Sequence, residues 1–215
     1  MLISHGHRFI FVHIQKTAGQ SMRRALEPYC QAPPRVGLRK ILSHLPVPEH
    51  AERAAFRPHA TAAWARLKIT PPVFERYTRF SVVRNPFDRA VSQFHFLQQR
   101  PEHHAHRHVR ELGFDEYLEF LRRRRWHRDP TQQGRLVDGR GRMLCDPILR
   151  FETLQSDFAG LCRQLQLDDA PSLTHRNASS HRPWREYYDS RATRDRVIDL
   201  FARDFDAFGY DTRID

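Results

Sequence analysis

The chain has 215 residues and a formal net charge of +11, from 36 Lys and Arg against 25 Asp and Glu. This length suits one sizeable core and is short for two independent domains, so we expect a single domain over residues 1–215. No apolar run approaches the roughly 20 residues that cross a bilayer, and no signal-peptide pattern is visible, which predicts a cytoplasmic protein without a membrane span. The charge favours anionic partners without choosing between nucleic acid, a phosphorylated cofactor and an acidic glycan.

The first informative segment is an apolar strand that leads through a polar loop into a helix. Residues 9–14 are nearly all apolar, as in a strand buried on both faces of a parallel sheet, and residues 21–27 are predicted to be helical. Backbone N–H groups at the helix start carry the positive end of the dipole, and Gly19 would let a ligand approach the backbone. The loop is therefore predicted to bind an anion through Lys16, Thr17, Gly19, Gln20 and Ser21.

The order of residues within this loop differs from that of the nucleoside-triphosphate loop. That loop reads G-x-x-x-x-G-K-[ST], with glycines before the lysine, whereas here Lys16 and Thr17 come first and Gly19 follows. The segment indicates phosphate binding with moderate specificity. An ordinary strand, turn and capped helix is the alternative.

Residues 33–58 are rich in proline and predict an irregular segment with a short helix at 48–55, which would border a binding cleft. A helix is expected at 59–67. The strand–turn–helix plan then repeats: residues 78–83 form a strand, Pro86 suits the first helical turn, and Asp88 favours its positive end.

Three basic or hydroxyl side chains stand out in this second unit of strand, turn and helix. Arg84 lies where the strand finishes, and Ser92 lies about two turns into the helix. Arg89 competes with Arg84 as the basic residue of a site, and a helix cap with solvated arginines is the alternative interpretation.

The rest of the chain alternates helix and strand. We expect helices at 114–125, 152–165 and 193–208, and a strand at 146–151. The last helix places apolar residues of the core at helical spacing, namely Val197, Ile198, Phe201, Phe205 and Phe208. The basic run at 122–125 with Trp126 would suit an anionic partner, but a solvated helix end is favoured.

Cysteines and histidines do not indicate a metal. The three cysteines, Cys30, Cys145 and Cys162, lack metal-ligand spacing, so reduced thiols are expected. Four of the fourteen histidines crowd residues 103–108, yet no carboxylate or cysteine pattern completes a site. A solvated loop and helix start is the favoured interpretation.

Residues 13–21 read HIQKTAGQS, and residues 83–94 read VRNPFDRAVSQF. Together they resemble the carbohydrate sulfotransferases that use 3′-phosphoadenosine 5′-phosphosulfate (PAPS), the group of heparan and chondroitin sulfotransferases and their bacterial relatives. The 5′-phosphosulfate loop of that family looks like HIPKTGGTS, and its 3′-phosphate element looks like VRNPxxRxxSxY. The resemblance extends to residues 59–62, 149–152 and 205–210, and so covers nearly the whole chain.

The resemblance implies an α/β fold with a central parallel sheet flanked by helices, akin to nucleotide kinases. It implies in-line transfer of a sulfuryl group from PAPS to a hydroxyl of a glycan or glycolipid, releasing adenosine 3′,5′-bisphosphate (PAP), with no metal required. Few lysines among many arginines suggest a GC-rich bacterial source.

The resemblance also assigns roles to residues. Lys16 would neutralise charge on the bridging oxygen, and Arg84 and Ser92 would bind the 3′ phosphate. Asn177 and Arg182 lie in a late polar segment that resembles the family loop closing over the nucleotide, although such segments are usually only loops. The residues implied at the 5′ phosphate are Lys16, Thr17, Ala18, Gly19, Gln20 and Ser21.

His59 opens a segment that resembles an HxTA-like element carrying the catalytic histidine in some family members. A neutral imidazole can accept a hydroxyl proton, and a packed or cap-proximal histidine is the equally weighted alternative. Glu27 and Glu52 are reserve candidates for the base, whereas a structural role is expected for His13.

The loop departs from the family pattern at Gln15, Ala18 and Gln20, which replace proline, glycine and threonine. An amide still donates to phosphate, and alanine is tolerated if φ is negative there. We expect altered cofactor affinity with function retained.

Two other functional classes remain open at this point. A nucleotide kinase or NTPase would explain the first loop, but no strand ends in an obvious magnesium-binding aspartate. A basic nucleic-acid-binding module would explain the charge, but no DNA- or RNA-binding motif is visible.

Overall fold

The computed structural model describes residues 1–30, 41, 44–45, 47–54, 56, 59–124, 129–167, 173 and 182–214. The chain divides into two compact units. The sheet unit comprises residues 1–83 and 135–176, and the helical unit comprises residues 84–134 and 177–215. Within the described part of the chain, no helix has both the length and the apolar character needed to cross a bilayer.

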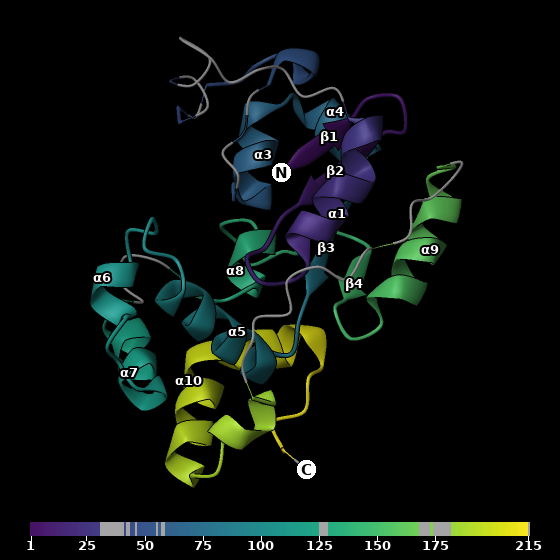
Figure 1. The fold of residues 1–215 in the computed structure, drawn as a ribbon. Helices are drawn as coiled ribbons and strands as arrows, with labels where there is room; N and C mark the ends of the chain where they lie inside the picture. Colours follow the sequence, from purple (N-terminus) through teal and green to yellow (C-terminus); the bar gives the residue numbers. More distant parts are fainter. Residues whose placement is uncertain are drawn as a thin grey trace. The chain divides into compact units, whose positions relative to one another are not determined.

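The sheet unit contains four strands in the order β1 (Leu2–Ser4), β2 (Phe9–Val12), β3 (Thr78–Val83) and β4 (Ile148–Arg150) (Figure 1). Strands β2, β3 and β4 are parallel, while β1 pairs antiparallel with β2. The predicted α/β class is confirmed, but the sheet is mixed where a parallel sheet was expected. The reason is local: only four residues join β1 to β2, and a parallel connection needs a long crossover.

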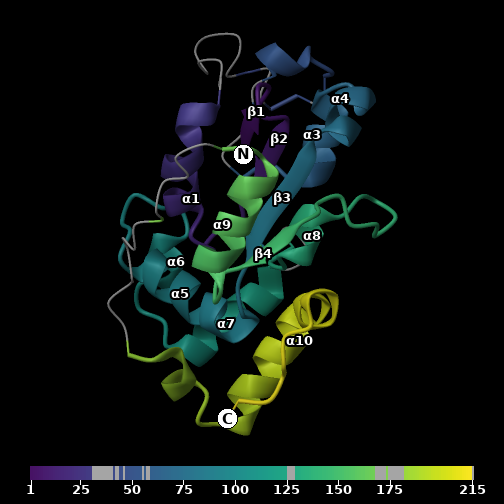
Figure 2. The ribbon, with the colours of Figure 1, turned by 90° about the vertical axis from the view of Figure 1, so that its right-hand side faces the viewer.

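Two helices, α1 (Gly19–Leu26) and α9 (Leu154–Gln164), pack on one face of this sheet. Figure 2 shows α3 (Ala62–Lys68) and α4 (Pro71–Arg76) on the side of the strands away from α1. Alternation along the strands directs every second side chain into the core beneath α1 and α9. The strand residues of this core are Leu2, Phe9, Phe11, Phe80, Val82 and Leu149.

Local signals determine where the helices of the sheet unit begin. Thr61 caps α3 by accepting a hydrogen bond from the Trp64 N–H, so the helix expected from residue 59 begins at residue 62. Pro71 starts α4 at the first helical position. Short 3₁₀ turns occupy Glu27–Tyr29 (η1) and Ala51–Arg53 (η2), the latter within the helix expected at 48–55.

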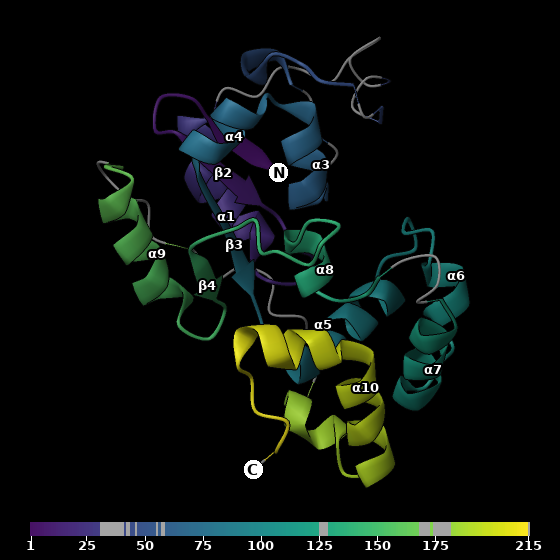
Figure 3. The ribbon, with the colours of Figure 1, turned by 180° about the vertical axis from the view of Figure 1, so that it is seen from behind.

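The helical unit contains α5 (Pro86–Gln98), α6 (His106–Val109), α7 (Phe114–Arg124), η3 (Trp184–Tyr187) and α10 (Arg191–Phe208). A single turn, α8 (Gln133–Leu136), follows residue 132. Figure 3 shows α5 beside α10, and the Phe87 and Phe205 rings of these helices lie 5.1 Å apart. The predicted last helix is confirmed with its apolar stripe, since Val197, Phe201 and Phe205 are buried. Gly209 ends it in the left-handed conformation, at φ 61°.

Candidate active site

The loop between β2 and α1 is tightly wound. Lys16 and Ala18 both adopt left-handed backbone conformations, with φ of 68° and 60°. Thr17 between them is buried, and its hydroxyl donates to the Ile14 carbonyl at 3.1 Å. That bond uses the only hydroxyl proton of Thr17, so any contact of Thr17 with an anion falls to its backbone N–H.

Helix α1 begins at Gly19, two residues before the predicted start, and its first intrahelical bond runs from the Met22 N–H to the Ala18 carbonyl. The Ala18 side chain supplies no cap. Gln20 is exposed, and Lys16 and Ser21 are partly exposed. The loop therefore presents the amino end of a helix together with a lysine, an amide and a hydroxyl, which is suitable chemistry for a phosphate or phosphosulfate.

The conformation of Ala18 corrects one expectation. Alanine in place of the family's glycine was expected to be harmless at negative φ, but φ is 60°. A side chain in this region of the Ramachandran map costs roughly 1–2 kcal/mol. The loop thus carries backbone strain at the residue that caps α1.

Replacing Ala18 with glycine should raise the free energy of unfolding by about 0.5–1 kcal/mol, because relief of the strain exceeds the extra chain entropy of glycine. Urea titration measures the change. Ala159→Gly, an exposed position inside α9, is the matched control and should be destabilising by about 1 kcal/mol. Destabilisation by Ala18→Gly would show that the loop is unstrained.

Gly19 has a packing role that the sequence did not predict. A Cβ built on Gly19 would lie 1.7 Å from His13 Nε2, far inside contact distance. The space left by the missing side chain is filled by the His13 ring, and so is not open to a ligand as the sequence had suggested. The His13 ring therefore sets the distance between the end of β2 and the first residue of α1.

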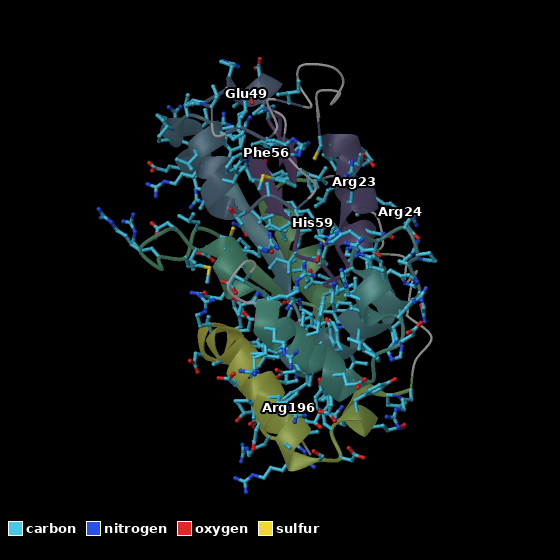
Figure 4. All side chains as sticks on the ribbon, turned by 90° about the vertical axis from the view of Figure 1, so that its left-hand side faces the viewer. Arg23, Arg24, Glu49, Phe56, His59 and Arg196 are labelled. Carbon is cyan, nitrogen blue, oxygen red and sulfur yellow. The ribbon has the colours of Figure 1, made fainter. Side chains whose placement is uncertain are left out.

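His13 and His59 form a pair, with ring centroids 4.7 Å apart. The Phe11 ring also stacks with His13, with centroids 6.0 Å apart. Burial, and next the neighbouring His59, lowers the pKa of His13 from 6.5 to about 3. His59, labelled in Figure 4, lies just before α3 in the sequence, and its carbonyl accepts a hydrogen bond from Arg135 Nη1 at 3.1 Å. His13, the first residue of the predicted 5′-phosphosulfate motif, thus contacts His59, the predicted base.

The lowered pKa of His13 predicts acid sensitivity. The folded protein keeps His13 neutral, whereas the unfolded chain takes up a proton below pH 6.5, so stability falls as the pH drops from 6.5 toward 3. At pH 5.0 this contribution amounts to about 2 kcal/mol. Urea unfolding at pH 7.5 and 5.0 should therefore show a smaller loss for His13→Asn than for wild type. Equal losses would mean that His13 is protonated in the folded state.

The reserve candidates for the base lie elsewhere on the surface. Glu27 follows the last residue of α1, about 12 Å of helical rise from the loop, and is exposed in an ion pair with Arg23 at 3.1 Å. Figure 4 shows Arg23 and Arg24 along this helix. Glu52 is exposed beside His50, at 3.9 Å. His59 is the candidate that the structure brings to the loop.

In the helical unit, Arg84 directly precedes the cap of α5. Asn85 Oδ1 accepts from the Phe87 N–H at 2.9 Å, and Pro86 occupies the first helical position as predicted. Asp88 in the first turn holds the Arg84 guanidinium by two hydrogen bonds, Nε–Oδ2 at 2.7 Å and Nη2–Oδ1 at 2.8 Å. The i, i+4 spacing of Arg84 and Asp88 indicates such an ion pair in the sequence. From the sequence alone, Asp88 is assigned only to the helix dipole, and its contact with Arg84 is not predicted.

Arg84 and Arg89 have different environments. Arg89 is partly buried, donates to the Pro130 carbonyl at 3.1 Å and lies 5.8 Å from the centre of the Phe201 ring. Arg84 keeps 13% of its side chain exposed. Arg89 is thus engaged with the Pro130 carbonyl and the Phe201 ring, and Arg84 is kept as the candidate ligand of an anion. Ser92 on α5 is 2% exposed.

Arg182 is exposed and lies over the Tyr187 ring of η3, 4.3 Å from its centre. The Tyr187 hydroxyl is hydrogen-bonded to His95 Nε2 of α5 at 2.6 Å. This contact connects the late segment to the helix that carries Ser92. Asn177 lies outside the described residues.

The remaining sequence candidates have ordinary structural environments. Arg122 and Arg123 are exposed and pair with Glu119, as expected for a solvated helix end, while residues 125 and 126 lie outside the described part. All three cysteines are free. In the described ranges, no group of three or more His, Cys, Asp or Glu side chains could hold a metal ion.

In a comparison with known families, the model described as "Sulfotransferase family" matches residues 1–211. The matched range runs through both units. No curated protein and no solved structure matches the chain.

Proposed function

Because the chain belongs to the sulfotransferase family, we propose that it transfers a sulfuryl group from PAPS to a hydroxyl of a carbohydrate acceptor, a glycan or a glycolipid. The observation that carries this proposal is the loop of residues 13–21, whose left-handed turns bring Lys16 to the amino end of α1. We propose further that residues 1–215 form a single sulfotransferase domain, acting in the cytoplasm of a bacterium.

The loop would bind the 5′-phosphosulfate. Thr17, Ala18 and Gly19 would contribute backbone N–H groups, because the Thr17 hydroxyl is engaged with Ile14 and the other two have no polar side chain. Gln20 and Ser21 would add side-chain donors. Lys16 would lie against the oxygen that bridges phosphorus and sulfur, where negative charge grows as the sulfuryl group departs.

In the proposed chemical step, side chains of this protein accept the proton and stabilise the leaving group. The acceptor oxygen forms a bond to sulfur while the bond from sulfur to the bridging oxygen breaks, and the bond electrons stay on that oxygen, leaving PAP. His59 accepts the hydroxyl proton, and Lys16 stabilises the leaving oxygen. The proposed step uses no metal ion.

Arg84 and Ser92 are proposed to bind the 3′ phosphate. A guanidinium offers five N–H donors in a planar arrangement that matches phosphate, and Asp88 uses two of them. Asn177 and Arg182 are proposed as further nucleotide contacts, supported for Arg182 by its place beside α5.

Isothermal titration calorimetry with PAP and with ATP–Mg²⁺ tests the class of nucleotide, and transfer of ³⁵S from PAPS to a panel of glycans and small alcohols tests the reaction. We expect tighter binding of PAP and label transfer to a saccharide. Tighter binding of ATP would favour a nucleotide kinase. Strongly salt-dependent DNA or RNA binding without transfer would favour a nucleic-acid-binding module.

Arg84→Ala should weaken PAP binding by roughly 10- to 150-fold, because charge-assisted hydrogen bonds contribute about 1.5–3 kcal/mol. Adenosine 5′-monophosphate (AMP), which differs from PAP only by the 3′ phosphate, should bind wild type and variant equally in calorimetry. Arg110→Ala removes the same charge from an exposed pair with Glu111 and is the control. Equal weakening of PAP and AMP by Arg84→Ala would refute the 3′-phosphate assignment.

A further inference from the structure

Gln132 binds both backbone polar groups of Arg84, from 48 residues away in the sequence. Gln132 Oε1 accepts from the Arg84 N–H at 2.9 Å, and Gln132 Nε2 donates to the Arg84 carbonyl at 2.8 Å. Arg84 lies between the end of β3 and the start of α5, outside both elements. A glutamine amide has a donor and an acceptor side by side, which suits it to this double contact.

Gln132 is itself held firmly. It is fully buried, and so is Asp204 on α10. Both carboxylate oxygens of Asp204 accept from the Gln132 backbone N–H, at 2.8 and 2.9 Å, and one also accepts from the Gln133 N–H at 2.8 Å. These bonds compensate the burial of the carboxylate and direct the Gln132 side chain toward Arg84.

The segment around Gln132 is held in place from several sides. Arg89 donates to the Pro130 carbonyl at 3.1 Å, and Arg203 pairs with Asp129 at 2.6 Å. Asp129 in turn accepts from the Thr131 N–H and hydroxyl, at 2.9 and 2.6 Å. Hydrogen bonds and an ion pair thus hold three successive residues before Gln132, which makes the segment a rigid support for the contact of the Gln132 side chain with Arg84.

We propose that Gln132, held by Asp204, is a positioning residue that fixes the Arg84 backbone so that its guanidinium faces the 3′ phosphate of the nucleotide. Asp88 orients the guanidinium from one side, and Gln132 fixes the backbone from which it extends. An arginine ordered before the ligand arrives loses less conformational entropy on binding, which strengthens binding of the phosphate. The inference rests on the proposed function, since it assumes that Arg84 binds this phosphate.

Gln132→Met tests the inference, because methionine keeps the length and the buried volume and lacks both hydrogen-bonding groups. Calorimetry should show PAP binding weakened by about tenfold and AMP binding unchanged. Gln133→Met is the matched control: the substitution is the same, the Gln133 backbone bond to Asp204 is kept, and the buried Gln133 Oε1 has no hydrogen-bond partner among the described residues. This control should bind both ligands like wild type.

A double-mutant cycle separates positioning from general stability. If Gln132 acts through Arg84, Gln132→Met should leave PAP affinity unchanged in an Arg84→Ala background. Asp204→Asn, which retains one acceptor oxygen for the backbone amides, should give the same selective loss and replaces Gln132→Met if that variant does not fold.

The outcomes distinguish the inference from its premise. Wild type that binds PAP no more tightly than AMP would refute the proposed 3′-phosphate site itself. Wild type that prefers PAP, with a preference unchanged in Gln132→Met, would overturn the positioning role alone. So would an additive effect of Gln132→Met in the cycle with Arg84→Ala.

Discussion

Replacing His59 with alanine should reduce turnover roughly 10²- to 10⁴-fold, the range typical for loss of a general base, while PAP binds as tightly as to wild type. The reason is that His59 is proposed to act on the acceptor hydroxyl and not on the nucleotide. Burial and the His59 neighbour keep the pKa of His13 at about 3, so the partner ring remains neutral at physiological pH. Initial rates at saturating acceptor and calorimetry with PAP measure the two effects.

The control for His59→Ala is His50→Ala, at an exposed histidine of the same unit. It should leave both turnover and PAP affinity unchanged. Near-normal turnover of His59→Ala at saturating acceptor would show that His59 is not the general base. Weakened PAP binding by His59→Ala would indicate that the ring only supports the loop through His13.

Lys16→Met should lower the single-turnover rate at saturating PAPS by about 10²- to 10³-fold, because negative charge on the bridging oxygen is largest in the transition state. Methionine has a similar length and keeps a side chain at φ 68°, so the substitution removes the charge without relaxing the backbone as glycine would. PAP, which has no such bridging oxygen, should lose far less affinity than the rate loses.

Arg24→Met is the control for Lys16→Met, since it removes one positive charge from an exposed position of α1. It should change the rate little. If Lys16→Met weakened PAP binding as strongly as it slowed transfer, Lys16 would be a ground-state ligand of the 5′ phosphate and not a stabiliser of the leaving oxygen.

Sequence patterns predicted the parts of the fold that local chemistry determines. The apolar run at β2, the Asn85–Pro86 start of α5 and the apolar stripe of α10 all carry their signal within a few residues. The start of α1 was placed two residues late because Ala18 caps it by a left-handed backbone and not by a side chain. Without a Ser, Thr, Asp or Asn at the cap, the usual sequence signal was missing.

The residues proposed to contact the ligand could be assigned from the sequence, whereas the residues that support them could not. Lys16 and Arg84 stand in short motifs with recognisable spacing. The contact of Gln132 with Arg84 spans 48 residues, and the contact of His59 with His13 depends on how α3 packs on the sheet. Such pairings depend on tertiary structure, and no local pattern of hydrophobicity or turn residues encodes them.

Because His13 packs against Gly19, substitutions at these two positions of one short motif should depend on each other. A relative that acquires a side chain at the position of Gly19 has to shed the ring at the position of His13, since both would occupy the same space. Substitutions at these two positions should therefore occur together. A relative without the ring at position 13 would also lack the ring contact with His59. The sequence of the loop is thereby constrained by the contact of His13 with His59, the proposed base, as well as by the proposed nucleotide contacts.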